Sequence, residues 1–294
     1  METRVYHIAF LTPCFCAGAE QTRAELRPSA IRGQLRWWFR CLGGTPAEEQ
    51  DVFGGVHGDN PTASTFSIRV RVKPNDGFKD WHLQIPKQGV EDARAYLLGF
   101  FCGRTGRLQT NDGALPPGSK AVLQVTFKRP PSPKLEQALR IFFSIGALGF
   151  RATRAAGAFA TVAPQQALTT QGWKDIASEL RAAGFHVALL AADFNVDWVS
   201  LIRFAGDLLK NKLRGRDGLD IGAGRNGTKP NALGSAEPRQ ASVLHLRPVR
   251  IDGRLRLALI EAPHARILGQ PARRAHGNRA SIITLAEEAK LLAV

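Results

Sequence analysis

Apolar residues recur along this chain with the spacings of helices and strands. When residues 29–42 are placed 100° apart, four apolar side chains fall on one narrow stripe of a helix: Ile31, Leu35, Trp38 and Leu42. In residues 66–73, apolar and polar side chains alternate, which is typical of a strand with one buried face. The polar face of this strand is basic, because it carries Ser67, Arg69, Arg71 and Lys73.

The periodic segments of the first half follow the order strand, helix, strand, strand, helix, strand, which is that of a ferredoxin-like domain. We expect these elements at residues 5–11, 29–42, 66–73, 121–127, 135–148 and 158–162. A loop is expected between residues 43 and 65. A long insertion is expected at residues 74–118, in which the apolar residues 96–101 indicate a further helix.

The second half of the chain repeats this pattern. Strands are expected at residues 184–191, 243–250 and 255–260, and helices at 198–213 and 282–292. A glycine turn and an Ala-Ser pair precede a strand in both halves, at Ala63-Ser64 and Ala241-Ser242, which favours a duplication. The predicted fold class is α+β, with two ferredoxin-like (RRM-like) domains in tandem and insertions between their elements. The expected domains are residues 1–165 and 166–294.

The composition indicates a cytoplasmic protein with an acidic polymer as its partner. The 294 residues are 44% hydrophobic, carry a formal charge of +15, and contain more than twice as many arginines as lysines. The planar guanidinium of arginine suits bidentate phosphate contacts and stacking on bases, so nucleic acid is the favoured polymer. No apolar run reaches the length of a membrane span, and residues 1–10 lack the pattern of a signal peptide. We therefore expect no membrane partner.

The four cysteines also fit a reducing compartment: Cys14, Cys16, Cys41 and Cys102. No C-x-x-C pair is present, and Cys14 and Cys16 are too close together for an ordinary disulfide. These two thiols and a histidine could form a zinc site, but burial as small apolar residues is the favoured interpretation. We therefore expect no metal site and no cofactor.

The helix at residues 29–42 carries a second stripe of arginines, formed by Arg32, Arg36 and Arg40. No Asp or Glu lies three or four residues from any of them, so the stripe has no intrahelical ion pair. An unpaired basic stripe indicates an external anion, and Trp37 at its border could stack on a base. The alternative is a solvated charged face with Trp37 in a seam of the core.

Three glycine-containing loops are also basic. The first, at residues 144–159, carries Arg151 and Arg154, so its backbone amides and its charges suit a phosphate backbone. The second, at residues 210–230, includes Arg225, and the third lies near the C-terminus. Together with the basic helix stripe, these loops favour single-stranded nucleic acid. The alternative for the first loop is an ordinary helix C-cap followed by flexible chain.

Several motifs resemble the RAMP superfamily. They are Leu-Thr-Pro-Cys-Phe at residues 11–15, the segment from Glu25 to Arg40 with its Arg-Gly-Gln-Leu-Arg-Trp-Trp run, Phe-Gly-Gly at residues 53–55, and Ala63-Ser64. In the second half, Leu233-Gly234-Ser235, Pro238-Arg239 and Ala241-Ser242 also resemble the family. Within the family, the chain is similar to the two-domain RAMP subunit of type III-B (Cmr) CRISPR effector complexes.

The resemblance implies two ferredoxin-like domains and a non-nucleolytic role in antiviral defence. Such a subunit contacts guide (CRISPR) RNA near its 3′ end, target RNA or both, and neighbouring RAMP subunits of the Cmr effector complex. We expect RNA contacts at nine residues: Arg27, Arg32, Arg36, Trp37, Arg40, Arg151, Arg154, Arg225 and Arg239. The glycine loop of the family, Gly-x-Arg-x-Arg-Arg-Gly-Phe-Gly, differs from Ala155-Ala156-Gly157-Ala158-Phe159 here, which lacks one arginine and one glycine.

Two other functions fit the sequence. Some RAMP relatives process guide RNA as metal-independent endoribonucleases, and His57 would then be the base while Arg32 stabilises charge. A general RNA chaperone acting alone is the other alternative. The histidines are scattered and no paired-carboxylate or G-x-S-x-G motif is present, so no catalytic residue is expected.

Overall fold

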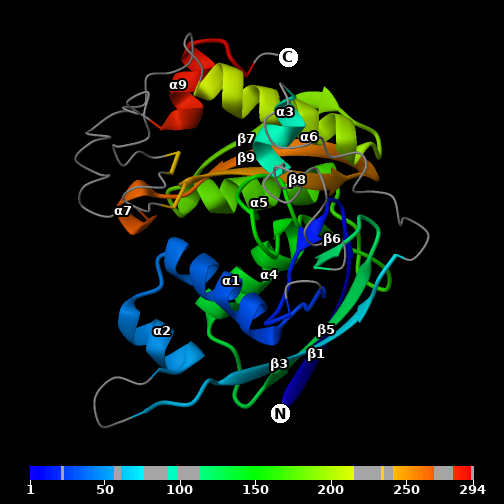
Figure 1. Cartoon of the computed structure of the whole chain (residues 1–294). Helices are drawn as coiled ribbons and strands as arrows, with labels where there is room; N and C mark the ends of the chain where they lie inside the picture. Colours follow the sequence, from blue (N-terminus) through cyan, green and yellow to red (C-terminus); the bar gives the residue numbers. More distant parts are fainter. Residues whose placement is uncertain are drawn as a thin grey trace.

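Antiparallel β-sheets form the centre of each half of the chain (Figure 1). The computed structural model describes residues 1–20, 23–55, 61–75, 92–98, 113–214, 233–234, 241–267 and 281–292. The mixed α+β class expected from the sequence is confirmed. Besides the two main sheets, a short pair joins β2 (Cys14–Phe15) to β4 (Ala114–Leu115).

The first sheet has four strands, in the spatial order β3 (Phe66–Lys73), β5 (Lys120–Phe127), β1 (Glu2–Phe10) and β6 (Phe159–Thr161). All neighbouring strands are antiparallel. Alternation along β5 buries one face, and α1 (Pro28–Cys41) and α4 (Pro133–Ile145) cover that face (Figure 1). The predicted order of strands and helices is therefore present in this half.

The long helix α1 follows the predicted apolar stripe. Pro28 occupies the first helical position, where its fixed φ suits the helix and its missing N–H costs nothing. The buried residues of this helix are Ile31, Leu35, Trp38, Phe39 and Cys41. The helix predicted at residues 29–42 is thereby confirmed with a shift of one residue at each end.

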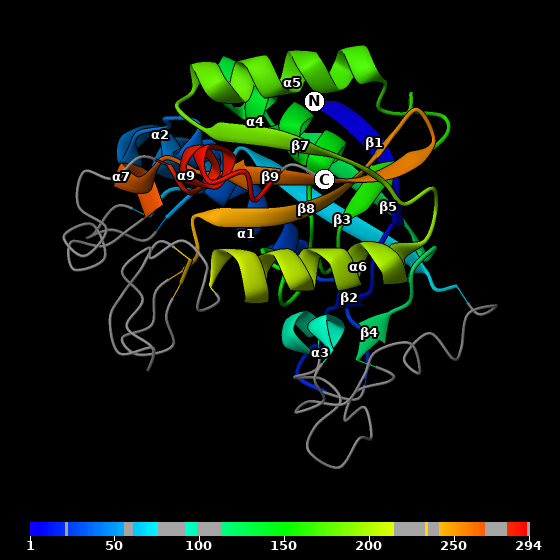
Figure 2. The same ribbon diagram turned by 90° about the horizontal axis from the view of Figure 1, so that it is seen from above.

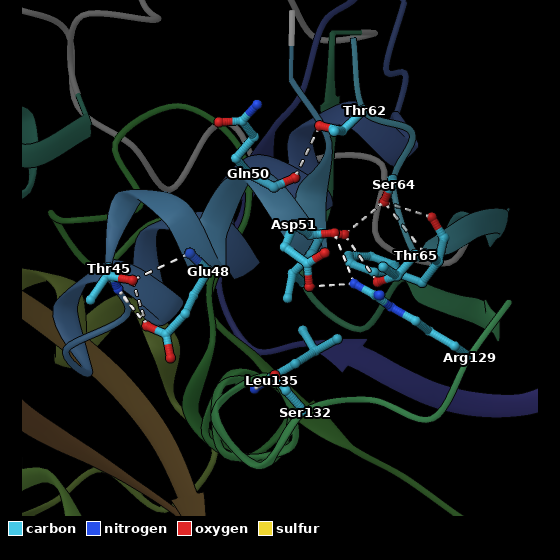
Figure 3. Close-up of polar contacts among 12 residues, drawn as sticks. Thr45, Glu48, Gln50, Asp51, Thr62, Ser64, Thr65, Arg129, Ser132 and Leu135 are labelled. Carbon is cyan, nitrogen blue, oxygen red and sulfur yellow. Dashed lines mark hydrogen bonds and ion pairs between the residues drawn. The ribbon is translucent and has the colours of Figure 1, made fainter. Parts of the chain in front are cut away.

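A second helix, α2 (Pro46–Phe53), occupies a segment that was expected to be a loop. Its apolar periodicity is weak, and the signal that marks it is a capping box. Thr45 Oγ1 accepts a hydrogen bond from the Glu48 amide, and the Glu48 carboxylate accepts one from the Thr45 amide (Figure 3). The loop prediction was wrong because this local motif outweighs the missing periodicity.

The second sheet has three strands, in the order β7 (His186–Asp193), β9 (Arg254–Glu261) and β8 (Leu244–Ile251). α5 (Thr170–Ala182) lies on one face and α6 (Trp198–Asp207) on the other (Figure 2). α5 was not predicted, whereas the helix predicted at 198–213 is confirmed, with a π-helical end at Leu208–Leu213. The other helices in the described part of the chain are α3 (Ala93–Leu98), which packs against α6, α7 (His264–Ile267) and α9 (Ile282–Glu288).

Each of the two apolar cores contains residues from both halves. In the first core, the Trp38 ring, which is 1% exposed, lies 5.9 Å from the Phe185 ring in a stacked arrangement. In the second core, Leu11 and Phe15 join the buried side chains of α6. The two halves therefore pack against each other through apolar surface on either side of residue 165.

Candidate nucleic-acid interface

Two of the three arginines on α1 are paired with an acidic residue of α2. Arg40 binds both carboxylate oxygens of Glu49, and Arg36 Nε lies 3.1 Å from Glu49 Oε1. Arg36 also donates to the carbonyl of Gly54 at 3.1 Å. The expectation of an unpaired stripe was wrong for these two residues, because their carboxylate comes from another helix. An RNA phosphate would have to compete with Glu49 for them.

Arg32 has no acidic partner among the residues that the structure describes. It lines a pocket of about 390 Å³ at the N-terminal end of α1. The other lining residues are Pro28, Ser29, Ser64, Phe66, Ser67, Ile68 and Lys128. Two cations, three hydroxyl groups and the first turn of a helix therefore surround one opening. The unpaired amides and the dipole of a helix N-terminus favour an anion at such a place.

Hydrogen bonds to the end of α2 fix the wall of this pocket (Figure 3). Ser64 Oγ and Thr65 Oγ1 donate to the carbonyl of Val52 at 3.3 and 3.0 Å. The amide of Lys128 donates to the carbonyl of Thr65 at 2.8 Å. These bonds tie together the end of α2, the start of β3 and the residue after β5, so the backbone of this wall is fixed before any ligand binds.

Trp37 is half-buried, and one face of its ring is covered by the protein itself. Its ring stacks on the imidazole of His245, with centroids 4.6 Å apart and planes 26° apart. Its other neighbour is Trp38, which it meets edge-on at 4.9 Å. A base could not stack on the face that His245 covers, so the structure favours the core-seam alternative for Trp37.

The glycine-rich loop between α4 and β6 binds the protein's own backbone. The amides of Leu148, Phe150, Ala155 and Gly157 donate to backbone carbonyls at 2.8–3.1 Å. Gly149 and Gly157 have φ angles of +84° and +61°, and a Cβ on either would lie 2.4 or 1.8 Å from a carbonyl oxygen. The expectation that these amides cradle a phosphate was wrong, because they are used to pack the loop.

Arg154 of the same loop points into the interior, with 8% of its surface exposed. Its Nη2 donates to the carbonyl of Leu233, whereas its buried Nη1 has no hydrogen-bond partner. Burial, and secondarily the charge of Arg214, lowers the pKa of Arg154 to about 9, so the guanidinium stays charged at neutral pH. Arg151 is half-buried, with its guanidinium 5.7 Å from the Phe150 ring.

A second buried cation, Arg247 of β8, was missed from the sequence. It is 1% exposed, its Nε and Nη1 have no partner, and its Nη2 lies 3.2 Å from Nδ1 of His245. Burial and the charges of Arg247 and Arg154 hold the pKa of His245 well below its ordinary range. The imidazole is therefore neutral and accepts the hydrogen bond. No sequence signal marks Arg247, because an arginine on a strand ordinarily indicates the solvent face.

The other residues that the sequence predicts to be functional lie either on the surface or outside the described residues. Arg27 is exposed at the N-cap of α1. Arg225, Arg239 and His57 lie outside the described residues. The basic face of the first sheet is confirmed, since the side chains exposed on β3 and the neighbouring end of β5 include Arg69, Arg71, Lys73 and Lys120. Such charges also protect an edge strand from pairing with another chain.

A family model settles which superfamily these features belong to. The model of the RAMP superfamily matches residues 7–160, which is more than half of the chain. The chain belongs to the RAMP superfamily. The matched part of this RAMP protein contains α1, the pocket at its N-terminus and the glycine-rich loop.

Relatives of this RAMP protein are CRISPR subunits. Over 150 residues it is 27% identical to the CRISPR system Cmr subunit Cmr1-1 of Pyrococcus furiosus, a match that covers 47% of this chain and 41% of that protein. The apo crystal structure of Cmr1 from Pyrococcus furiosus gives a TM-score of 0.53 at 19% identity, over 89% of this chain and 88% of that one. The matching sequence thus spans less than half of the relative's length, and the structural likeness shows the fold.

A second solved structure extends the likeness over nearly the whole chain. A chain of the type III-B Cmr-beta complex, bound to cognate target RNA and AMPPnP in the presence of single-stranded DNA, gives a TM-score of 0.54. The identity is 11%, and the match covers 99% of this chain and 98% of that one. At 11% sequence identity, this similarity shows that the two chains share a fold.

The described part of the RAMP protein contains neither a group of potential metal ligands nor a membrane-spanning helix. Within it, no three His, Cys, Asp or Glu side chains are grouped as metal ligands. Cys14, Cys16 and Cys41 are free thiols and buried, as expected for small apolar side chains. The described helices include none that is long and apolar enough to cross a membrane.

Proposed function

We propose that this RAMP protein is a non-catalytic, RNA-binding subunit of a type III-B CRISPR (Cmr) ribonucleoprotein that acts in antiviral defence in the cytoplasm. It binds guide RNA near its 3′ end, target RNA or both, together with other RAMP subunits. The family match, the similarity to Cmr1-1 and the fold shared with a chain of a target-RNA-bound Cmr complex support this proposal. Two tandem ferredoxin-like domains, residues 1–165 and 166–294, are part of it, because each half has its own antiparallel sheet.

The observation that carries the proposal is the pocket at the N-terminus of α1. Arg32 and Lys128 line it, and neither has an acidic partner in the described part of the chain. Ser29 and Ser67 add hydroxyl donors, whereas the Ser64 hydroxyl already donates to a backbone carbonyl. A phosphate of the RNA backbone has the charge and the acceptor oxygens that this set of donors requires. We therefore assign the first phosphate contact to Arg32.

The other expected RNA contacts differ in how directly they are available. Arg27 is exposed beside the pocket, and Arg36 and Arg40 need the RNA to compete with Glu49. Trp37 offers the ring surface that His245 leaves uncovered. The remaining proposed contacts are Arg151, Arg154, Arg225 and Arg239, of which the first two lie on the glycine-rich loop.

Substitution of Arg32 tests whether this residue contacts an RNA phosphate. Arg32→Gln should weaken binding of single-stranded RNA by a similar factor for all sequences, because a phosphate carries no base information. It should also reduce the slope of log affinity against log salt by about 0.7 for one lost phosphate contact on a single strand. Fluorescence anisotropy of a labelled oligonucleotide over a salt series measures both.

Arg40→Gln is the matched control, since Arg40 is exposed on the same helix but neutralised by Glu49. It should change the slope less than Arg32→Gln does. A folded Arg32→Gln protein with an unchanged slope would contradict the phosphate assignment. Equal effects of the two exchanges would show that general surface charge, not the pocket, binds RNA.

Cleavage of guide RNA by this chain is the rival function. Its candidate base, His57, lies outside the described residues. Incubation of the full chain with a guide-RNA precursor in the presence of a chelator should leave the RNA intact. Cleavage of the precursor that is abolished by His57→Ala would contradict the proposed binding role and would support the endoribonuclease function.

A further inference from the structure

The four-stranded sheet is fully covered on one face only. α1 and α4 pack on that face, whereas the three-stranded sheet of the second half has α5 on one face and α6 on the other (Figures 1 and 2). On the second face of the first sheet, Ala158 and Ala160 beside β6 join the core shared with the second half. The rest of that face, formed by β3, β5 and the first residues of β1, is largely exposed, and we call it the open face.

The pairing register identifies the side chains of the open face. Directly paired residues of antiparallel strands point to the same side of a sheet. The register gives four rows across β3, β5 and β1, which are Ser67, Thr126 and Thr3, then Arg69, Gln124 and Val5, then Arg71, Val122 and His7, then Lys73, Lys120 and Ala9. No Asp or Glu is among these twelve residues.

One side of the open face is strongly basic. Arg69, Arg71 and Lys73 are exposed along β3, and Lys120 lies directly opposite Lys73. Like charges in this position repel each other, and none of the four cations has an acidic partner among the described residues. Cations on β3 also guard an exposed edge, but β5 is an inner strand, so that role does not account for Lys120. The charges therefore indicate an acidic partner.

The other side of the open face is partly apolar. Val5 of β1 is 42% exposed, and Val122 of β5 lies half-buried on the diagonal next to it. The hydroxyl groups of Thr3 and Thr126 hydrogen-bond to each other at 3.1 Å. A sheet face that meets only water usually carries polar side chains at every position. The two valines therefore favour a partner that is apolar as well as acidic.

The side chains of the open face favour a protein over RNA. Protein sheets that bind single-stranded RNA stack its bases on aromatic side chains. The twelve residues include no Phe, Tyr or Trp, and their only ring is the half-buried imidazole of His7. A phosphate backbone gains nothing by covering valine. A protein segment can place carboxylates against the cations and apolar side chains against the valines, as in the charged and apolar parts of protein interfaces.

The dimensions of the open face fit one helix. Its four rows extend for about 20 Å along the strands, and its three strands span about 10 Å. An α-helix is about 10 Å wide, and about 13 residues give it a length of 20 Å. On the opposite face of the same sheet, α1 packs in this manner with 14 residues.

We propose that the open face is a docking surface for an amphipathic helix of another protein, acidic along one side and aliphatic along the other. The acidic side lies against the four cations and the aliphatic side against the two valines. The inference goes beyond the proposed RNA-binding function, because it gives the chain a contact with a protein. These cations and valines do not line the pocket at the N-terminus of α1.

Two synthetic peptides of about 13 residues test the docking surface on the full chain. The striped peptide carries glutamates along one stripe of a helix and leucines along the neighbouring stripe. The reordered peptide contains the same residues in an order that destroys both stripes. Both are stapled, because isolated helices of this length are marginal in water. Fluorescence anisotropy should show that the striped peptide binds and that the reordered peptide binds several-fold more weakly.

Two variants assign this binding to the open face. Arg71→Gln removes the cation between Arg69 and Lys73, and Val5→Thr replaces a methyl group by a hydroxyl while keeping the β-branched shape. Each should weaken binding of the striped peptide several-fold. Lys174→Gln on α5 is the matched control, because Lys174 is exposed on another element and loses the same charge. Urea unfolding checks that all three variants are folded.

The outcomes distinguish this surface from general basicity and from RNA binding. Weaker peptide binding in Arg71→Gln and Val5→Thr, with Lys174→Gln unchanged, would support the docking surface. Equal effects of Arg71→Gln and Lys174→Gln, or equal binding of the two peptides, would overturn it, because net charge would explain the binding. Absence of peptide binding would also overturn it, and a shallower salt slope for RNA in Arg71→Gln would then assign the face to RNA. The proposed function is tested separately by Arg32→Gln and stands or falls independently.

Discussion

The indole ring of Trp37 lies against the imidazole of His245 with the ring centroids 4.6 Å apart. Trp37 belongs to α1 of the first half and His245 to β8 of the second, so this contact joins the helix with the candidate phosphate pocket to the other sheet. Because His245 is buried and accepts a hydrogen bond from Arg247, the contact requires a neutral imidazole. The packing between the halves thus includes an imidazole that stays neutral in the folded protein, because its pKa is held well below the ordinary value.

Acidification should destabilise the protein through His245. Its folded-state pKa is lowered by burial and by the charges of Arg247 and Arg154, so the unfolded chain takes up a proton at a higher pH than the folded one. The stability it contributes is complete above the unfolded pKa of about 6.5 and is lost as the pH falls below it, by up to about 1.4 kcal/mol per pH unit. Urea unfolding at several pH values between neutral and mildly acidic conditions measures this slope.

His245→Phe is the control for this prediction. Phenylalanine keeps a ring beside Trp37 but cannot titrate. The variant should be less stable than the wild type at neutral pH, because Arg247 loses its acceptor. Its stability should change less over the same pH interval. A slope equal to that of the wild type would assign the pH dependence to other groups.

Removal of the Glu49 charge should strengthen RNA binding. Glu49→Gln frees Arg36 and Arg40, which the carboxylate now holds, and the two cations become available to phosphates. Affinity for single-stranded RNA should rise several-fold at low salt, and the salt slope should become steeper by up to about 1.4 for two new phosphate contacts. The stability cost should stay below about 1 kcal/mol per pair, since Arg40 is largely exposed.

The neighbouring Glu48 offers a matched control. Its carboxylate closes the capping box with Thr45 and pairs with no arginine of α1. Glu48→Gln should therefore leave RNA affinity and its salt slope unchanged. If both glutamine variants bound RNA equally well, the effect would come from net charge and the pairing of Arg36 and Arg40 would be irrelevant to binding.

Gly33→Ala should stabilise the protein and weaken its binding of RNA. Gly33 is exposed in the middle of α1, and a Cβ there would have no atom within 4 Å. Alanine should raise the free energy of unfolding by about 0.5–1 kcal/mol, because glycine is a poor helix former. If RNA lies against the helix beside Arg32, the added methyl group obstructs it. Thermal melts and anisotropy measure the two effects, and a stabilised variant with wild-type affinity would exclude such a close approach.

Gly157→Ala should have the opposite effect on stability. The φ angle of Gly157 is +61°, and its Cβ would lie 1.8 Å from the carbonyl oxygen of Leu148. The loop would have to move, and its hydrogen bonds to Pro13 and Leu148 would be lost. We expect a loss of more than about 2 kcal/mol, which combines backbone strain with broken backbone bonds. A melting temperature within a few degrees of the wild type would show that the loop relaxes without cost.

Local periodicity predicted two elements that pack through a single regular face, α1 and β3. The stripe of α1 and the alternation of β3 are properties of short segments, and both elements lie where they were expected. α2 was missed because its signal is a capping box, Thr45 to Glu48, and not a repeated apolar spacing. Periodicity was not sufficient by itself, because α5 was also missed although Trp173, Ile176 and Leu180 form a regular apolar stripe along it.

The chemistry of the candidate site was harder to predict, because charge partners meet through the fold. Glu49 lies beyond helical spacing from Arg36 and Arg40, so no sequence rule pairs them. The burial of Arg154 follows from the contact between its loop and Leu246, which are almost a hundred residues apart. Only Arg32 keeps the availability that the pattern of α1 predicted.

The contact between the glycine-rich loop and β8 determines whether either half of the chain can be stable alone. β8 is the outer strand of its sheet, and such a strand can pair with another molecule and start aggregation. Here residues 153–155 of the first half occupy part of that edge, through the two backbone bonds to Leu246. Cutting the chain after residue 165 would uncover the edge and leave the loop without its support. Division of the sequence into two domains therefore does not provide two pieces that can be separated.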